Sequence, residues 1–154
     1  MEPSDAPERV ALCIGLPHGP EAPGLARREI AETFDRRLPA TTLGDVLVVV
    51  SELVANAVRH GGAGVGPGIA LALDVDPGRV RIAAMDGGRR RRRPARDDAV
   101  GGWGLALVAS LADRWGFAPG RPTVAWAEFD LVSSPCDSNR DPGARRARNA
   151  PPAR

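Results

Sequence analysis

One long, mostly apolar segment carries a stripe of polar side chains, and this pattern constrains the fold more than any other feature. Glu52, Asn56 and His60 place a carboxylate, a carboxamide and an imidazole at intervals of four residues. Side chains four residues apart lie on the same face of an α-helix. The pattern predicts a helix with this polar ridge on one side and, toward a sheet or core, the apolar residues Leu47, Val50, Val54, Ala57 and Val58.

The ends of this helix carry their own signals. Thr41 or Thr42 is expected to cap its start, with Asp45 in the first turn, where negative charge is favourable. At the other end, two basic residues oppose the negative end of the helix dipole and two glycines stop the helix: Arg59, His60, Gly61 and Gly62.

The residues of the polar ridge are suited to chemistry at a phosphate group. A carboxamide oxygen such as that of Asn56 is a good ligand for Mg²⁺, which takes its other ligands from water and phosphates. Glu52, one turn earlier, could orient or deprotonate a nucleophile beside that ion. Such residues on a helix are most often just its solvated face, and His60 alone makes an adequate C-terminal charge cap.

A glycine-containing turn follows a predicted strand. Residues 80–85 alternate as a half-buried strand does, and the strand ends in Asp86. A carboxylate there can accept a hydrogen bond from an exocyclic amine, and Gly88 lets a flat ring approach the backbone. An isolated Asp-x-Gly carries little weight, because ordinary turns use the same residues.

A second glycine-rich element opens an apolar helix. Gly102 and Gly104 precede Leu105, where a helix of about 105–114 is expected to begin. Glycines at a helix start expose N–H groups to phosphate. Trp103, between them, is by default a packing residue, with coverage of a nucleotide as the alternative.

In this order the motifs resemble the N, G1 and G2 boxes of the gyrase, chaperone, histidine kinase and mismatch-repair (GHKL) ATPase superfamily. Within it, segments 50–60 and 112–116 resemble the anti-sigma-factor serine kinase branch found in actinobacteria. The resemblance covers roughly residues 8–132. The motifs that carry it are Glu52-x-x-x-Asn56-Ala57-x-x-His60, Asp86-x-Gly88 and Gly102-x-Gly104-Leu105.

The resemblance implies ATP or ADP with Mg²⁺ as ligands and gives each motif residue a role. Asn56 would bind Mg²⁺ and phosphate, Asp86 would receive the adenine amino group, and Glu52 would be the catalytic base. The remaining residues are implied to line the nucleotide or its lid: His60, Gly88, Gly102, Gly104 and Leu105.

The segment between the second and third motifs departs from the superfamily pattern. Residues 89–93 are five consecutive arginines within a lid of about 87–101. Such a run is typical of a solvated loop that self-repulsion keeps extended. Arg93 and Arg96 are the alternatives, as residues that meet phosphates or an acidic partner.

Composition sets the outer limits. The 154 residues suit one domain, and their hydrophobic fraction of 43% is enough for a core. A net charge of +2 is too small to argue for nucleic acid, and a chain without lysine excludes a Walker-type phosphate lysine. Cys13 and Cys136 have neither disulfide-framework nor metal-ligand spacing. An acidic N-terminus without a signal sequence, and no apolar run of roughly 20 residues, predict a cytoplasmic protein that does not enter a membrane.

The remaining pattern predicts an α+β fold. Strands grouped in the second half, with helices before and among them, favour a mixed, largely antiparallel sheet covered on one face by helices, the two-layer sandwich that the resemblance implies. The domain is expected at 8–132, between a flexible N-terminus at 1–7 and a flexible Arg/Pro-rich tail at 133–154. The expected strands are 9–15, 69–75, 80–85, 116–117 and 123–131, and the first helix is 22–38, ended by Pro39.

Three functions follow from the resemblance. The first is a serine/threonine kinase that inhibits a sigma factor and phosphorylates an anti-anti-sigma (STAS-type) partner. The second is a catalytically silent module that senses ATP or ADP, and either could form a homodimer. The third, a detached histidine-kinase catalytic domain, needs a phosphoacceptor histidine on a dimerisation helix, whereas His18 lies in a Pro/Gly loop.

Overall fold

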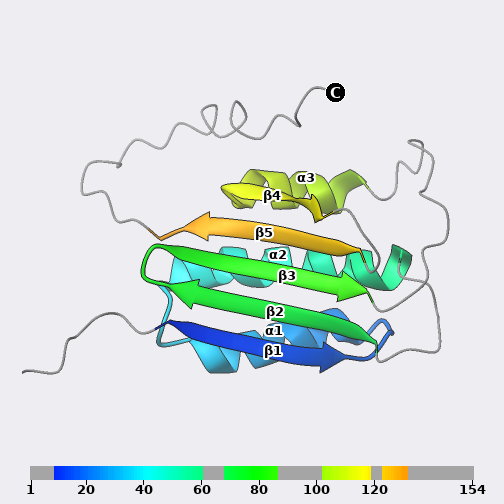
Figure 1. The fold of residues 1–154 in the computed structure, drawn as a ribbon, viewed down its shortest axis with the longest axis horizontal. Coiled ribbons are helices and arrows are strands. Elements are labelled where there is room, and N and C mark those ends of the chain that lie inside the picture. The colour runs from blue at the N-terminus through cyan, green and yellow to red at the C-terminus, as the bar shows by residue number, and fades with distance from the viewer. Residues whose placement is uncertain (1–8, 61–67, 87–101, 119–122, 132–154) are drawn as a thin grey trace, which may run out of the picture.

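A sheet and a layer of helices make up the described part of the chain, which is residues 9–60, 68–86, 102–118 and 123–131 of a computed structural model (Figure 1). The expected N-terminus 1–7, lid 87–101 and tail 133–154 lie outside these residues, as do Gly61, Gly62 and Gly88. The elements are β1 (Val10–Leu16), α1 (Ala22–Phe34), α2 (Ala40–His60), β2 (Ile69–Asp76), β3 (Arg79–Asp86), α3 (Gly102–Leu111), β4 (Arg114–Ala118) and β5 (Val124–Asp130).

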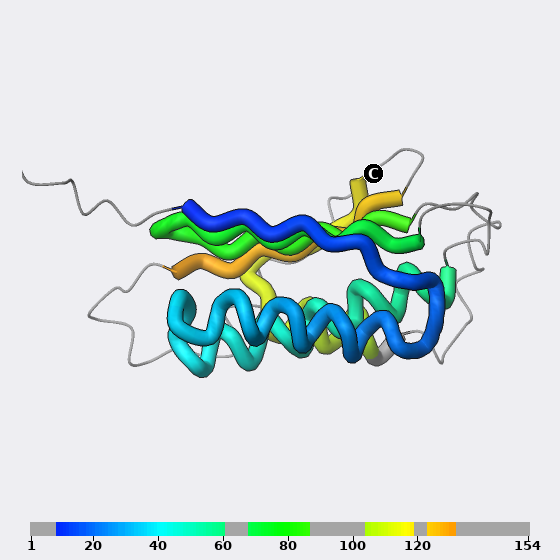
Figure 2. Tube along the Cα trace, turned by 90° about the horizontal axis from the view of Figure 1, so that it is seen from below, coloured from blue at the N-terminus to red at the C-terminus, as the bar shows by residue number. Residues whose placement is uncertain are grey.

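The five strands are ordered β1-β2-β3-β5-β4, and the helices cover one face of the sheet (Figure 2). This arrangement confirms the predicted α+β two-layer sandwich. The expected sheet was mixed, whereas all four neighbouring pairs are antiparallel. The pairing changes order because β5 returns beside β3 and leaves β4 at the edge.

Helix α2 supplies the centre of the core. Its buried residues are Leu43, Val46, Val49, Val50, Leu53, Val54 and Ala57, and Leu47 and Val58 are partly buried against them. By length and composition alone α2 would also be long enough to cross a membrane, which corrects the expectation that no apolar run approaches that length. In this fold its apolar face is covered by the sheet and by α1 instead.

The boundaries of the first two helices differ from the prediction. Helix α1 ends at Phe34 instead of running to Leu38. Helix α2 begins at Ala40, so neither threonine caps it; Thr41 and Thr42 lie inside the first turn, and Asp45 lies beyond it. The carbonyl of Pro39 accepts the N–H of Leu43 at 2.9 Å. Proline suits this position because its missing N–H would have no partner in the helix.

Helix α3 is shifted toward the N-terminus relative to the prediction. It covers Gly102–Leu111, not 105–114, because Arg114 already belongs to β4 and pairs with Glu128 of β5. The hairpin prediction is confirmed, with Asp76 facing Arg79 in register. Asp76 closes the turn by accepting the N–H of Gly78 at 2.9 Å.

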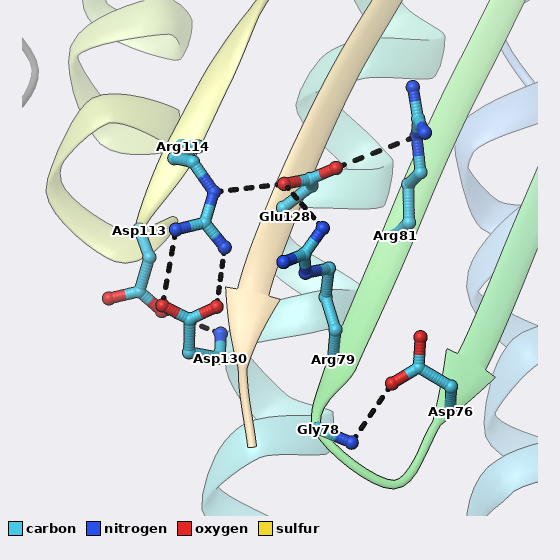
Figure 3. Close-up of polar contacts among 8 residues, drawn as sticks. All are labelled: Asp76, Gly78, Arg79, Arg81, Asp113, Arg114, Glu128 and Asp130. Carbon is cyan, nitrogen blue, oxygen red and sulfur yellow. Dashed lines mark hydrogen bonds and ion pairs between the residues drawn. The ribbon is translucent and has the colours of Figure 1, made fainter. Parts of the chain in front are cut away.

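An arginine cluster surrounds one buried carboxylate on the sheet (Figure 3). Glu128 is 7% exposed, and its side-chain oxygens lie 2.9 Å from Arg114, 3.6 Å from Arg79 and 3.7 Å from Arg81. Arg114 also binds Asp130, and hydrogen bonds to Asp130 and Glu128 raise the pKa of the guanidinium. Three strands are therefore joined by charge as well as by backbone hydrogen bonds.

Asp113 fixes the turn between α3 and β4 through backbone groups of β5. The N–H of Asp113 donates to the carbonyl of Glu128 at 2.9 Å, and the Asp113 carboxylate accepts the N–H of Asp130 at 2.8 Å. Asp113 is thus a donor to one residue of β5 and an acceptor from another. These two bonds attach the C-terminal end of α3 to β5.

We predict that Glu128→Gln destabilises the fold by about 1–3 kcal/mol, because three arginines lose a buried counter-charge while staying partly hydrated. Thermal melting measures this loss. Glu32→Gln, an exposed carboxylate on α1, is the matched control and should melt as the wild type does. Equal melting temperatures for the two variants would contradict a stabilising role for Glu128.

Candidate functional site

Three chain segments that carry the predicted motifs meet at one end of the sandwich (Figure 1). The C-terminal half of α2 reaches this end, β3 finishes there, and α3 begins there. The fold therefore brings the C-terminal half of α2, the end of β3 and the start of α3 to a common edge, although these segments lie far apart in the sequence.

Glu52 of α2 and Gly104 of α3 lie in contact at this end of the sandwich. A Cβ atom at position 104 would lie 2.2 Å from Oε2 of Glu52 and 3.3 Å from its Cδ. Any larger residue would overlap the carboxylate, so the glycine lets the backbone of α3 reach it. Glu52 keeps 29% of its side chain exposed. The carboxylate thus lies beside the first turn of α3 and still faces solvent.

Arg59 lies next to this contact. Its Nη2 is 4.0 Å from Oε2 of Glu52, and its Nε donates to the carbonyl of Ala55 at 3.2 Å. Sequence reasoning gave Arg59 only the task of opposing the helix dipole. The structure adds a carboxylate partner two turns earlier on the same helix.

Asp86 is the last residue of β3 and is 7% exposed. It shares the strand face of the buried residues Val80, Ile82 and Ala84, so its side chain belongs to the helix side of the sheet. Its N–H donates to the carbonyl of Thr123 at 3.3 Å. Within the described residues, no hydrogen bond or ion pair engages its carboxylate.

The Asp86 carboxylate is therefore free to accept a hydrogen bond from a ligand that brings a donor. An exocyclic amine fits that requirement, since it offers hydrogens where Asp86 offers only lone pairs. Asp86 ends β3 on the side of the sandwich where α2 ends and α3 begins.

The other predicted residues lie around the same edge. Asn56 is half-buried on α2, one turn after Glu52, and His60 is the exposed last residue of that helix. Gly102 is the first residue of α3, and Leu105 is partly buried in its first turn. Among the described members of the predicted set, Glu52 and Gly104 lie in contact.

The described residues contain no group of three His, Cys, Asp or Glu side chains that could hold a metal ion. The carboxamide oxygen of Asn56 is a donor that Mg²⁺ can use, with phosphate oxygens and water as its other ligands. That donor set suits Mg²⁺, which retains several waters in proteins.

A link between the first two helices was not foreseen from the sequence. Arg27 donates from Nη1 to Oγ of Ser51 at 2.9 Å, and Ser51 donates to the carbonyl of Leu47 at 2.8 Å. Ser51 directly precedes Glu52. The hydrogen bond from Arg27 therefore links α1 to α2 at the residue next to the candidate base. The only sequence signal was a serine on the exposed side of an apolar helix.

The comparison with protein families agrees with this geometry. The model of the histidine kinase-like ATPase domain matches residues 16–125, which include all three motifs. This chain belongs to that family. Membership in the histidine kinase-like ATPase family confirms the superfamily resemblance carried by the motifs.

A search of curated proteins finds no match for this histidine kinase-like ATPase domain. Among solved structures, it is similar to the crystal structure of the RsbU and RsbW domains of Rv1364c from Mycobacterium tuberculosis. The TM-score is 0.62 at 27% sequence identity, over 78% of this chain. The match covers 32% of that chain, so the present domain corresponds to about a third of the solved RsbU–RsbW chain.

We predict that Gly104→Ala leaves the domain folded and displaces the Glu52 carboxylate. The new methyl group would overlap only the end of a flexible side chain, and alanine favours a helix by about 0.5–1 kcal/mol over glycine. Gly104→Ala should raise the melting temperature more in a Glu52→Ala background than in the wild type, because the overlap with the Glu52 carboxylate is then absent. Thermal melting of the four proteins in this double-mutant cycle measures the difference.

Gly68→Ala is the contrasting control for that cycle. Gly68 has φ +85°, and a Cβ there would lie 2.1 Å from the backbone oxygen of Leu16. A backbone carbonyl cannot move aside as the end of a flexible side chain can. Gly68→Ala should therefore lower the stability of the fold. If Gly104→Ala is destabilised as much as Gly68→Ala, the contact at Gly104 involves more than the Glu52 side chain.

Proposed function

We propose that this protein binds ATP and is a serine/threonine protein kinase of the anti-sigma-factor type, which phosphorylates an anti-anti-sigma partner. The observation that carries the proposal is the Glu52 carboxylate beside the first turn of α3, one helical turn before Asn56. A base, a metal ligand and a helix N-terminus then belong to one edge of the fold.

The nucleotide would be held from two sides. Asp86 would accept the amino group of adenine, in keeping with its burial and its unengaged carboxylate. The first turn of α3, including Gly102, Gly104 and Leu105, would lie near the phosphates, because N–H groups at a helix start favour anions. His60, exposed at the end of α2, and Gly88 would border the nucleotide.

Asn56 would supply the protein ligand to Mg²⁺. When bound, the ion would neutralise charge on the phosphates, and phosphoryl transfer depends largely on such positioning and charge stabilisation. Glu52 would orient the serine hydroxyl of the partner and take up its proton as the γ-phosphate is transferred. Its partial exposure is compatible with access by a protein substrate.

The proposed partners follow from the family branch that the sequence resembles. A sigma factor would be bound and inhibited, and an anti-anti-sigma protein of the STAS type would be phosphorylated. The similarity to a structure that includes an RsbW domain supports this branch. We place the protein in the cytoplasm as a regulator without direct contact to nucleic acid, in a domain of about 8–132 with a lid near 87–101, and consider a homodimer compatible with this function.

A catalytically silent ATP/ADP-sensing module is the second candidate, and one observation favours it. The Glu52 carboxylate is already flanked by the backbone at Gly104 and by the guanidinium of Arg59. A carboxylate held in this way could serve to position α3 in response to nucleotide, without abstracting a proton.

We predict that Asp86→Asn lowers the preference for ATP over GTP by roughly tenfold or more, because the new amide can present a donor where adenine needs an acceptor. Calorimetric titration with both nucleotides measures the ratio. Asp76→Asn, at the opposite end of the hairpin, is the matched control. An unchanged ratio would remove Asp86 from the adenine site.

We predict that Glu52→Ala keeps ADP affinity within a few-fold and reduces phosphorylation of the partner by roughly 10²-fold or more, the usual scale for loss of a general base. Labelled ATP and a purified STAS-type domain provide the assay, with Glu32→Ala as control. Loss of ADP binding would make Glu52 a nucleotide ligand instead. If the wild type binds ATP and transfers nothing to any partner tested, the sensing module replaces the kinase.

A further inference from the structure

We propose that Arg59 is a positioning residue for Glu52, and that its guanidinium sets the direction of the carboxylate toward α3. This inference deepens the proposed function and rests on it for its catalytic consequence. The ion pair itself is a property of the fold that can be tested separately.

The helix brings the two residues into line. Seven residues correspond to almost two turns, so Arg59 and Glu52 differ by only about 20° around α2 and by about 10 Å along it. Helical side chains lean toward the N-terminus, which sends the long arginine side chain back toward the glutamate. The donor at Nε binds the carbonyl of Ala55 on the way, at 3.2 Å.

The guanidinium therefore has two partners in different directions. Its Nε is fixed to the helix backbone, and its Nη2 faces Oε2 of Glu52 at 4.0 Å. The planar fork of arginine allows both contacts at once, whereas the compact ammonium of lysine offers a single point of charge. Arg59 is 45% exposed, so the pair is accessible to salt and to ligands.

Gly104 completes the arrangement on the other side of the carboxylate. The position of a Cβ at Gly104 is 2.2 Å from Oε2 of Glu52 and 3.9 Å from Nη2 of Arg59. Among the residues that the structure describes, Arg59 is the one cation paired with Glu52. The carboxylate is thus confined between a charge on its own helix and the backbone of the next.

Confinement matters because a glutamate side chain otherwise samples several rotamers. A general base acts only within hydrogen-bond reach of its proton, and small displacements lower the rate. Arg59 should therefore affect the transfer step through Glu52, with little effect on nucleotide affinity.

The test is a double-mutant cycle in phosphotransfer to a STAS-type domain. Arg59→Ala should lower kcat by roughly tenfold with the Kd for ADP within about twofold, a coupling in the usual range for contacting residues. Arg59→Lys should recover part of that loss. In a Glu52→Ala background, Arg59→Ala should have no further effect. Arg28→Ala, which removes an exposed arginine 3.8 Å from Glu29 on α1, is the matched control.

A second measurement needs no kinase activity. Hydrogen exchange of the amides in the first turn of α3 should accelerate by roughly two- to fivefold in Arg59→Ala and in Glu52→Ala, the scale of a partly exposed ion pair. The double variant should exchange no faster than Glu52→Ala. High salt should reduce the difference between wild type and Arg59→Ala.

The two measurements separate the possible failures. If the wild type transfers no phosphate to the partner, the proposed function is overturned. Hydrogen exchange in the single and double variants would still decide whether Arg59 pairs with Glu52. Arg59→Ala could change the exchange rate or the transfer rate by the same factor in the wild type and in the Glu52→Ala background. That result would overturn the positioning role. A wild-type exchange pattern in Arg59→Ala would do the same.

Discussion

The burial of one face of α2 is the constraint on which the rest of the structure depends. Seven apolar residues of this helix lie in the core, and α1 and the sheet pack around them. Once that face is fixed, the rotation of the helix is fixed too, because side chains repeat every 3.6 residues. Glu52 and Asn56 lie in the C-terminal half of this helix, which runs toward the edge where β3 ends and α3 begins.

The candidate site is therefore a consequence of packing. The apolar stripe holds α2 against the sheet, and the absence of a side chain at Gly104 allows α3 to approach the carboxylate. The far end of α3 is tied to β5 through Asp113. One end of this short helix meets the candidate base, and the other is anchored to the sheet.

Charge is used differently in the two parts of the fold. At the β3–β5–β4 side, Glu128 is nearly buried and satisfied by three arginines, which makes it part of the structural frame. Asp86 is equally buried but has no such partner in the described residues. The Glu128 carboxylate is therefore already engaged, whereas the Asp86 carboxylate can still accept a hydrogen bond from a ligand.

The sequence by itself determined the class of fold, the hairpin and the three motifs. Alternation in β2 and β3 and the four-residue spacing on α2 are local patterns, and the structure confirms both. Helix ends were predicted less well, because Pro39 and the pairing of Arg114 with Glu128 decided them. Only the tertiary structure revealed the cluster around Glu128 and the approach of Glu52 to Gly104 and Arg59. Contacts between distant segments depend on which strands become neighbours and on how the helices are rotated on the sheet. The periodicity of a single segment gives no information about either.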